Sequence, residues 1–150
     1  MEQKINLRRA TLEDIDKILE LEKSLDGTKI YSALTDKTEL TNEINKTFFY
    51  LIEKDGEIAG DIAYEIKNEN HAYIDGIVVA PKFQRQGIAR QTMEIILEKL
   101  KNIKTIDLVT HPENEIAIKL YESLGFKKIG DQIENYFEDN EPRILMVLEK

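Results

Sequence analysis

Apolar residues recur every three to four positions in four stretches of the chain, and this period predicts four helices. The first is expected after Thr11, which has Asp14 at the spacing of a capping box. The second covers residues 36 to 46, the third begins at Ile88, and the fourth covers residues 114 to 124. The positions that carry the period are Leu12, Ile15, Ile18, Leu19, Leu25, Leu40, Ile44, Ala89, Thr92, Met93, Ile96, Leu97, Leu100, Ile116, Ala117, Leu120, Tyr121 and Leu124.

Short β-rich runs between these helices predict the strands of a sheet. A hairpin is expected where Asp55-Gly56 separates two such runs within residues 48 to 66. The other strands are expected at residues 5–10, 72–79, 105–110, 127–137 and 143–149. The order of elements is β-α-α-β-β-β-α-β-α-β-β, which predicts a mixed sheet with helices packed on it.

One window, residues 76 to 93, contains no Asp or Glu, although 29 of the 150 residues are acidic and the formal net charge is -8. About 3.5 acids would be expected in a random window of that length. Three basic residues in it, Lys82, Arg85 and Arg90, belong to the loop "PKFQRQGIAR" at residues 81 to 90. The pattern predicts that this loop meets an anion.

The composition restricts the class of protein. A hydrophobic fraction of 41% and a charged fraction of 33% are typical of a globular chain, with one domain expected over residues 1–150. No signal segment is visible, so a cytoplasmic protein without a membrane partner is expected. The absence of Cys excludes disulfides, thiolate metal sites and a cysteine nucleophile. A pI near 4.9 argues against nucleic-acid binding and suits either solubility or a cationic partner, such as an amine or a polyamine.

The basic loop is expected to lead from a buried strand into the first turn of a helix. The N–H groups of a first turn have no partner inside the helix, and the helix dipole adds positive potential. Gly87 allows the main chain to approach a ligand, while Arg85 and Arg90 can clamp its charge. Phosphate or pyrophosphate is the expected guest. The P-loop and dinucleotide-binding patterns are absent, and an ordinary helix start after a proline turn would look the same locally.

Two motifs carry a resemblance to a known family. Residues 84 to 89, "QRQGIA", fit the pattern [QR]-x-x-G-x-[GA], and residues 114 to 126, "NEIAIKLYESLGF", follow at the expected distance. The pair resembles the GNAT superfamily of acyl-CoA-dependent N-acetyltransferases, to whose opening strand and helix "INLRRATLEDIDKILELE" is also similar. The resemblance is closest to ribosomal-protein and other protein N-terminal acetyltransferases. It implies an α+β fold in three layers, with a mixed, mostly antiparallel sheet of six to seven strands flanked by about four helices.

The resemblance also implies where acetyl-CoA, the expected cosubstrate, would bind. Main-chain amides of the loop would hold the pyrophosphate, and the edge of the preceding strand would pair with the pantetheine arm in a slot between two splayed strands. The residue matching Asn114 contacts the pantetheine in related enzymes, although Asn114 is also a good helix N-cap. The cofactor-binding residues implied in this way are Ile77, Val78, Val79, Gln84, Arg85, Gln86, Gly87, Ile88, Ala89, Arg90, Asn114 and Ala117.

Amide formation from a thioester needs a neutral amine, a polarised carbonyl and a proton for the departing thiolate. The resemblance places Tyr121 near the sulfur, and a phenol is an acid suited to a thiolate of comparable basicity. Its spacing from Ala117 and Leu124 also suits a core-facing aromatic residue. A main-chain N–H near Val79 is the expected donor to the oxyanion.

The general base does not transfer directly from the resemblance. Many N-terminal acetyltransferases carry a Glu at the position held here by Val109, and valine cannot accept a proton. Other branches carry an acid at the position of Asp75, which makes Asp75 the first candidate, directly or through a water. His111 and His71 are the alternatives.

The predicted function is therefore direct transfer of an acetyl group from acetyl-CoA to a primary amine in a ternary complex, without a metal. At pH 7 a peptide α-amine costs about 1 kcal/mol to deprotonate, whereas a lysine-like amine costs about 4–5 kcal/mol. A site without a strong base therefore favours a protein or peptide N-terminus over a small amine or polyamine, which an acidic pocket would favour.

Other features leave alternatives open. The segment "SLDGTKIYSAL" contains Tyr31 but lacks the proline that the N-terminal enzymes tend to carry. Tyr136 and Phe137 either form a wall of the acceptor site or only cover the sheet. In a different class, the chain would be a non-catalytic acyl-CoA-binding sensor or regulatory module. Either a monomer or a homodimer is compatible with the sequence.

Overall fold

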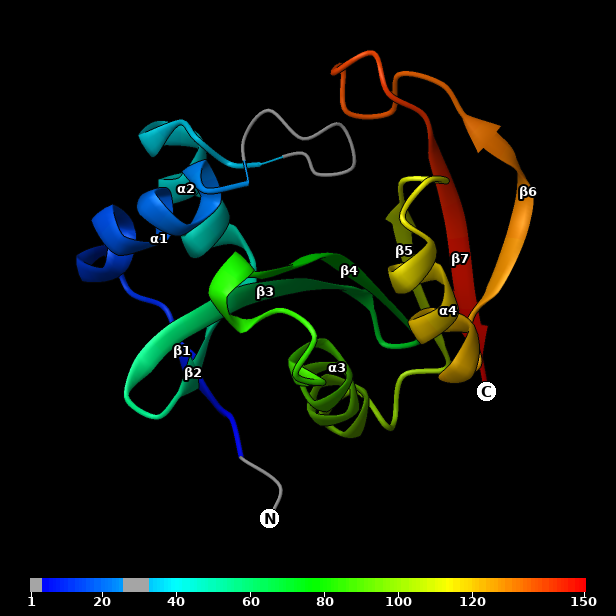
Figure 1. The fold of residues 1–150 in the computed structure, drawn as a ribbon. Coiled ribbons are helices and arrows are strands. Elements are labelled where there is room, and N and C mark those ends of the chain that lie inside the picture. Colours follow the sequence, from blue (N-terminus) through cyan, green and yellow to red (C-terminus); the bar gives the residue numbers. More distant parts are fainter. Residues whose placement is uncertain (1–3, 26–32) are drawn as a thin grey trace.

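The computed structural model describes residues 4–25 and 33–150, so the predicted role of Tyr31 lies outside the described residues (Figure 1). One seven-stranded sheet runs in the order β1-β2-β3-β4-β5-β7-β6. All neighbouring strands are antiparallel except β4 and β5, which are parallel. The strands are β1 (Asn6–Arg9), β2 (Phe48–Lys54), β3 (Glu57–Asn68), β4 (His71–Val79), β5 (Thr105–Thr110), β6 (Lys127–Ile133) and β7 (Arg143–Glu149).

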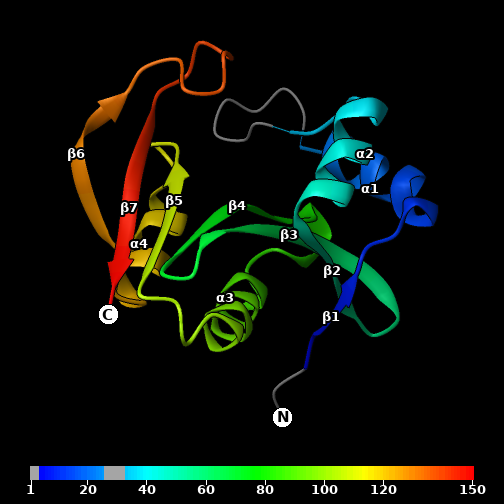
Figure 2. The same cartoon turned by 180° about the vertical axis from the view of Figure 1, so that it is seen from behind.

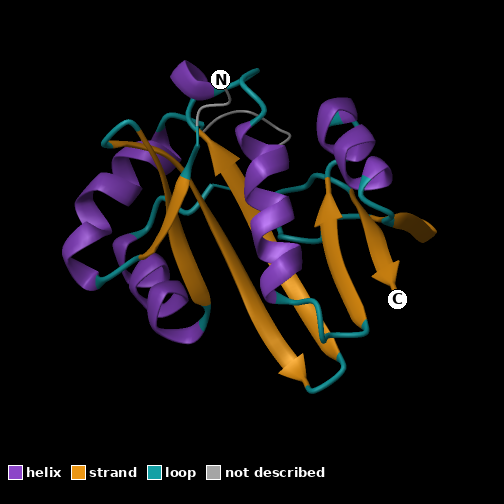
Figure 3. Cartoon of the chain, turned by 90° about the horizontal axis from the view of Figure 1, so that it is seen from below, coloured by secondary structure: helices purple, strands orange, loops and turns teal. Residues whose placement is uncertain are grey.

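In the described part of the chain, four α-helices cover the two faces of this sheet, in the predicted order (Figure 3). Helices α1 (Ile15–Lys23) and α2 (Lys37–Lys46) pack on one face, and α3 (Ile88–Lys99) and α4 (Glu115–Ser123) pack on the other. Seen from behind, the two pairs lie on either side of β3 and β4 (Figure 2). The mixed, mostly antiparallel sheet between helices confirms the predicted fold class. None of the described helices is long and apolar enough to cross a membrane.

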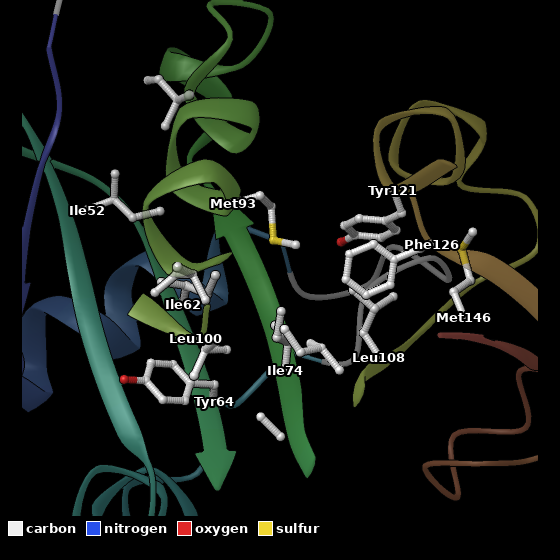
Figure 4. Close-up of a cluster of buried hydrophobic side chains, with 14 of the residues drawn as sticks. Ile52, Ile62, Tyr64, Ile74, Met93, Leu100, Leu108, Tyr121, Phe126 and Met146 are labelled. Carbon is white, nitrogen blue, oxygen red and sulfur yellow. The ribbon is translucent and has the colours of Figure 1, made fainter. Parts of the chain in front are cut away.

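Two apolar clusters hold these layers together. The cluster under α1 and α2 joins Ile18 and Leu40 to Phe49 and Leu51 of β2. The larger cluster under α3 and α4 contains Met93, Ile96, Tyr121 and Phe126 with apolar side chains of β3, β4, β5 and β7 (Figure 4). Burial of these side chains is the main stabilising contribution to such a layered fold.

The ends of the helices follow the residues that the sequence offers as caps. Asp14 accepts a hydrogen bond from Thr11 N at 2.9 Å, although a short 3-10 turn at Leu12–Asp14 precedes α1. The predicted cap at Asn114 is confirmed, since its Oδ1 accepts from Ala117 N at 3.3 Å. Gly87 begins α3 with φ 77, a left-handed conformation that glycine adopts without strain.

The strand predicted at residues 127–137 is shorter than expected. β6 ends at Ile133, and Tyr136 and Phe137 lie in the turn that leads to β7. The prediction was wrong here because Asn135 has φ 51, a left-handed conformation that cannot continue a strand.

The feature that positions the site is an opening between the two central strands. The parallel pairing of β4 with β5 ends at Ile74↔Leu108, although both strands continue. On its other edge β4 pairs with β3, where Ala63 faces Gly76 and Tyr64 faces Ile74, so Asp75 is the extra residue of a β-bulge. The bulge bends β4 away from β5 just where their pairing stops.

Candidate functional site

The edge of β4 that faces the opening offers main-chain hydrogen-bonding groups. Ala80 N donates to Ala59 O of β3 at 2.8 Å. Because N–H groups alternate between the two edges of a strand, the N–H groups of Val79 and Ile77 point away from β3, toward the opening. Val79 O, on the same edge, accepts from Gln84 Nε2 at 3.0 Å. The predicted oxyanion donor at Val79 is thus available at this edge.

The loop between β4 and α3 forms a cradle of main-chain N–H groups. In the described part of the chain, no acceptor is found for the main-chain N–H groups of residues 85 to 90. Arg85 and Gly87 both have positive φ, 64 and 77, so left-handed residues alternate along the loop. Such alternation turns successive N–H groups into one concave surface that binds anions, and the N-terminus of α3 adds its dipole. The structure therefore supports the anion site expected for these residues.

Several side chains of the loop hold the protein together instead of facing a ligand. Gln86 Oε1 accepts from the buried Lys54, and Lys82 Nζ lies 2.9 Å from Glu57 Oε1. Glu57, from β3, thus balances part of the charge of a loop that contains no acid of its own. Arg90, expected as a charge clamp, donates to Ser123 Oγ at 2.8 Å and links α3 to α4. Arg85, the other residue expected to clamp the charge of an anion, is exposed on the loop.

A cavity of about 300 Å³ lies at the opening between β4 and β5. It receives residues from α1 and α2 on one face, from α4 on the other, from the central strands and from the beginning of β7. The side chains and backbone that line it include Glu22, Leu25, Leu34, Glu43, Phe49, Asp61, Ala63, Asp75, Gly76, Ile77, Val78, Val109, Thr110, His111, Asn114, Tyr121, Phe137 and Arg143. The predicted Asp75, Asn114 and Tyr121 therefore meet at one cavity, beside the open edge of β4.

Asp75, the predicted base, is the bulge residue and is half-buried in the cavity wall. Burial, together with a hydrogen bond to Glu65 and the charge of that carboxylate, raises the pKa of Asp75 to about 8. Its Oδ2 is buried without a donor among the described residues. A carboxyl group with a pKa near 8 is a far stronger proton acceptor than an ordinary aspartate once it is ionised.

Tyr121 is buried against the core, with its ring centroid 5.9 Å from that of Phe126. Its hydroxyl points away from Phe126, toward the side of Met93 (Figure 4). Tyr121 also lines the cavity. It can therefore be both an aromatic residue of the core and a residue of the candidate site. Val109 lines the cavity from β5, where its backbone pairs with Leu145 of β7.

The histidines do not suit the role of a base. His71 lies at the far end of β4, beside Thr105 at the start of β5, and its Nε2 is 2.9 Å from Asp107 Oδ1. His111 is buried beside the cavity. Its Nδ1 accepts from Glu113 N at 3.0 Å, so its Nε2 carries the ring proton and donates to Glu141 Oε1 at 2.7 Å. This leaves His111 no free nitrogen to accept a proton.

One group of ligand-type atoms has the spacing of a metal site. Atoms of His111, Glu113 and Glu141 lie within 4.8 Å of one another. The hydrogen bonds that His111 makes with these two residues account for the arrangement without a metal.

A pair of buried carboxyl groups in the cavity wall was missed by the sequence analysis. Glu22 of α1 is 3% exposed and Asp61 of β3 is 5% exposed. Burial, the charge of Glu22 and a hydrogen bond to it raise the pKa of Asp61 well above its usual range, and burial raises the pKa of Glu22 as well. The signal was a charged residue at an apolar position, because Glu22 continues the stripe of Ile15 and Ile18.

The remaining wall comes from the turn before β7. Phe137 lines the cavity, and its ring meets that of Tyr136 edge-on at 4.7 Å. Arg143 is buried beside it, with its guanidinium 5.1 Å from the Phe137 ring and 2.9 Å from Asp139 Oδ2. Its charge is therefore already paired within the protein.

Comparison with known proteins gives a family match and curated relatives. The model of the acetyltransferase (GNAT) family matches residues 12–126. The [ribosomal protein bS18]-alanine N-acetyltransferase of Escherichia coli (strain K12) is 29% identical over 119 residues, covering 76% of this chain and 79% of that protein. The UPF0157 protein YqkA of Bacillus subtilis is 35% identical over 75 residues, but these span only 22% of its length.

Solved structures share the fold over nearly the whole chain. The ribosomal-protein-S18-alanine N-acetyltransferase from Escherichia coli has a TM-score of 0.80 and 24% identity, covering 97% of this chain and 94% of that one. A spermidine N-acetyltransferase chimera from Vibrio cholerae and hSSAT has a TM-score of 0.79 and 23% identity, covering 97% and 95%. A GNAT family acetyltransferase from Elizabethkingia anophelis with acetyl-CoA bound has a TM-score of 0.71 and 25% identity, covering 97% and 98%.

Proposed function

The chain belongs to the acetyltransferase (GNAT) family and is an acetyl-CoA-dependent N-acetyltransferase, and on that premise we propose its acceptor and its catalytic residues. The acceptor is a primary amine, in the first place the α-amine at the N-terminus of a protein or peptide. The amine attacks acetyl-CoA directly in a ternary complex. Membership of this family sets aside the alternative of a non-catalytic acyl-CoA-binding module.

One observation carries the assignment of residues. The unpaired edge of β4 beyond Ile74 runs beside a cavity lined by both Asp75 and Tyr121, and it leads into the loop with the free N–H groups of residues 85 to 90. A ligand that lies along this edge with an anionic group in the loop has its other end at the cavity. Acetyl-CoA has that form, with a pyrophosphate, an extended arm and a terminal thioester.

The residues of the loop and the strand hold the cosubstrate. The N–H groups of residues 85 to 90, which include Gln86, Gly87, Ile88 and Ala89, bind the pyrophosphate, and Arg85 adds charge. The edge formed by residues 77–79 pairs with the pantetheine arm, as an added strand would. Gln84 orients this edge through Val79 O, while Asn114 contacts the arm beside the small Ala117.

The chemistry requires two proton transfers. The amine nitrogen forms a bond to the thioester carbonyl carbon, and the C–S bond breaks. The carbonyl oxygen receives a hydrogen bond from Val79 N–H as its charge develops. The Asp75 carboxylate takes a proton from the attacking nitrogen, and the Tyr121 hydroxyl gives a proton to the departing thiolate.

The choice of acceptor rests on the strength of the base. A carboxyl group with a pKa of about 8 matches an α-amine, whose pKa is about 7.7–8, better than a lysine-like amine with a pKa near 10.4. The relative that is 29% identical is itself named as an alanine N-acetyltransferase of ribosomal protein bS18. A small amine or polyamine is the second candidate, favoured by the four carboxyl groups, Glu22, Glu43, Asp61 and Asp75, that line the cavity.

The test is acetyl-CoA-dependent release of free thiol with two sets of acceptors, short peptides with free N-termini and small amines that include polyamines. Release with the peptides, and at least tenfold less with the amines, is the expected result. The reverse order would support the second candidate, and no release with either set would contradict both.

The variant Tyr121→Phe tests the proposed acid in the same assay. We expect kcat to fall by about 100-fold or more, with CoA binding unchanged, because the variant loses the proton-donating hydroxyl and keeps the ring. The matched control is Tyr50→Phe, which removes a hydroxyl from β2 at a site outside the cavity lining. Equal rates for Tyr121→Phe and the control would rule out Tyr121 as the acid.

A further inference from the structure

The Glu22–Asp61 pair forms a buried acidic wall of the cavity, on the face of the sheet that α1 and α2 cover. Asp61 is opposite Val78 in the β3–β4 register, one strand away from the open edge of β4, and it lines the same cavity as Asp75. Glu22 reaches the same place from the buried side of α1. Their exposed fractions of 5% and 3% are unusual for carboxyl groups to which residues 4–25 and 33–150 offer no cationic partner.

The hydrogen bonds of the pair are incomplete. Glu22 Oε1 accepts from Leu34 N at 2.9 Å. Glu22 Oε2 and Asp61 Oδ2 are buried, and no donor from the described residues reaches either atom. The two carboxyl groups also hydrogen-bond to each other, which requires a proton between them. A cation brought by a ligand would replace that proton and complete the hydrogen bonds.

Among the residues that the structure describes, the other charged groups of the cavity give the pair no counter-ion. Arg143 is paired with Asp139, and the His111 ring is engaged by Glu141. The other carboxyl groups among the described residues that line the cavity belong to Glu43, which is half-buried on α2, and to Asp75, which is hydrogen-bonded to Glu65. Among the described residues, the cavity wall is therefore negative where α1 meets β3.

We propose that the Glu22–Asp61 pair binds a second cationic group of the acceptor, a positive charge a few bonds from the amine that is acetylated. The inference rests on the proposed function and specifies its acceptor. The reacting amine must be neutral when it attacks, and Asp75 is placed to take its proton. A buried carboxylate pair stabilises an ammonium group instead, so it suits a group that stays charged. Both a diamine and a peptide that begins with a basic residue offer this chemistry.

The test compares acceptors that differ in one charge. The first two are 1,4-diaminobutane and 1-aminopentane, in which a methyl group replaces the second ammonium. The other two are a peptide that begins with lysine and the same peptide with norleucine. In one of the two pairs, we expect kcat/KM to be at least tenfold higher for the acceptor that carries the second positive charge. A preference in the amine pair identifies a free diamine, and a preference in the peptide pair identifies a basic first residue.

The isosteric double variant Glu22→Gln with Asp61→Asn tests the residues. The preference is expected to fall below threefold, while kcat/KM for the singly charged acceptors stays within about twofold. The matched control is Asp16→Asn with Glu20→Gln, which removes two carboxylates from the exposed side of α1 and should keep the preference. Calorimetric binding of 1,4-diaminobutane and 1-aminopentane to the CoA-bound wild-type protein gives a measurement that does not depend on the folding of the variant.

The outcomes separate the two levels of the argument. Equal turnover of both members in both pairs, or an unchanged preference in the double variant, overturns the role of the pair and leaves the proposed function standing. Acetylation of none of the four acceptors overturns the proposed function and this inference with it.

Discussion

Asp75 offers a test of the site that needs no acceptor, because its ionisation must be linked to folding. In the folded protein its pKa is about 8, raised mainly by burial and then by Glu65. In an unfolded chain an aspartate titrates near 3.9. Between about pH 4 and pH 8 the folded state therefore binds a proton that the unfolded state has lost. The free energy of unfolding must fall as pH rises through this window.

The size of this effect follows from the linkage. For a group that is fully shielded from solvent, each pH unit in the window lowers the free energy of unfolding by about 1.4 kcal/mol. From pH 4 to pH 7 that limit is about 4 kcal/mol. Asp75 is only half-buried, so solvent screening reduces the expected total to about 1–2 kcal/mol.

The variant Asp75→Asn removes the titration and keeps a donor for Glu65. It should match the wild type in stability near pH 4 and exceed it by about 1–2 kcal/mol at pH 8, measured by urea unfolding across the window. Asp131→Asn, on the exposed strand β6, is the control and should show no such pH-dependent gain. A constant difference between Asp75→Asn and the wild type at every pH would refute the reasoning.

The same variant separates a base from a structural carboxyl group. If Asp75 accepts the proton of the amine, kcat falls by about 100-fold or more in Asp75→Asn, although the protein is more stable. In the wild type, kcat at saturating acceptor rises with pH with a midpoint near 8, the pKa of Asp75, and this midpoint does not move when the pKa of the acceptor amine is changed. A midpoint that follows the acceptor would assign the titration to the substrate.

Two further predictions concern the backbone of the cosubstrate site. A Cβ on Gly60 would lie 2.0 Å from Val78 O, so Gly60→Ala must displace β4 at the opening. We expect the free energy of unfolding, measured in urea, to fall by about 1–3 kcal/mol and kcat to fall with it. Wild-type values of both would contradict the close approach of the two strands. Arg85→Ala should raise the KM for acetyl-CoA about tenfold. Lys82→Ala should change it less than threefold, because Lys82 is paired with Glu57. Equal effects of the two variants would contradict the assignment of Arg85, and not Lys82, to the pyrophosphate.

The order of elements could be predicted from the sequence because each element has its own period. Apolar residues at helical spacing in α1 and α3, and the Asp55-Gly56 turn between β2 and β3, are local signals that tertiary contacts reinforce. The cradle of N–H groups at residues 85 to 90 was predictable for the same reason, since it depends on local backbone geometry.

The bulge at Asp75 could not be predicted, because a bulge is defined by two strands. Within "AYIDGIVV" nothing marks Asp75 as an extra residue; only the register of Ala63 and Tyr64 on β3 does so. The Glu22–Asp61 pair was hidden in a similar way. Each residue is a charge at an apolar position, but 39 positions separate them along the sequence, and only the packing of α1 on β3 shows that they share a wall.

The positions of Val109 and Asp75 suggest why this chain can lack the glutamate expected on β5. The opening has two walls, and a carboxyl group on either one borders the same cavity. On β5, the backbone of position 109 is held in the ladder with Leu145, whereas the bulge takes Asp75 out of the β3–β4 ladder. In our proposal the base is Asp75 on β4, on the opposite side of the opening from position 109 of β5. There burial, and after it the neighbouring Glu65 carboxylate, raise the pKa of Asp75 to about 8, which suits the weakly basic α-amine better than a lysine-like amine.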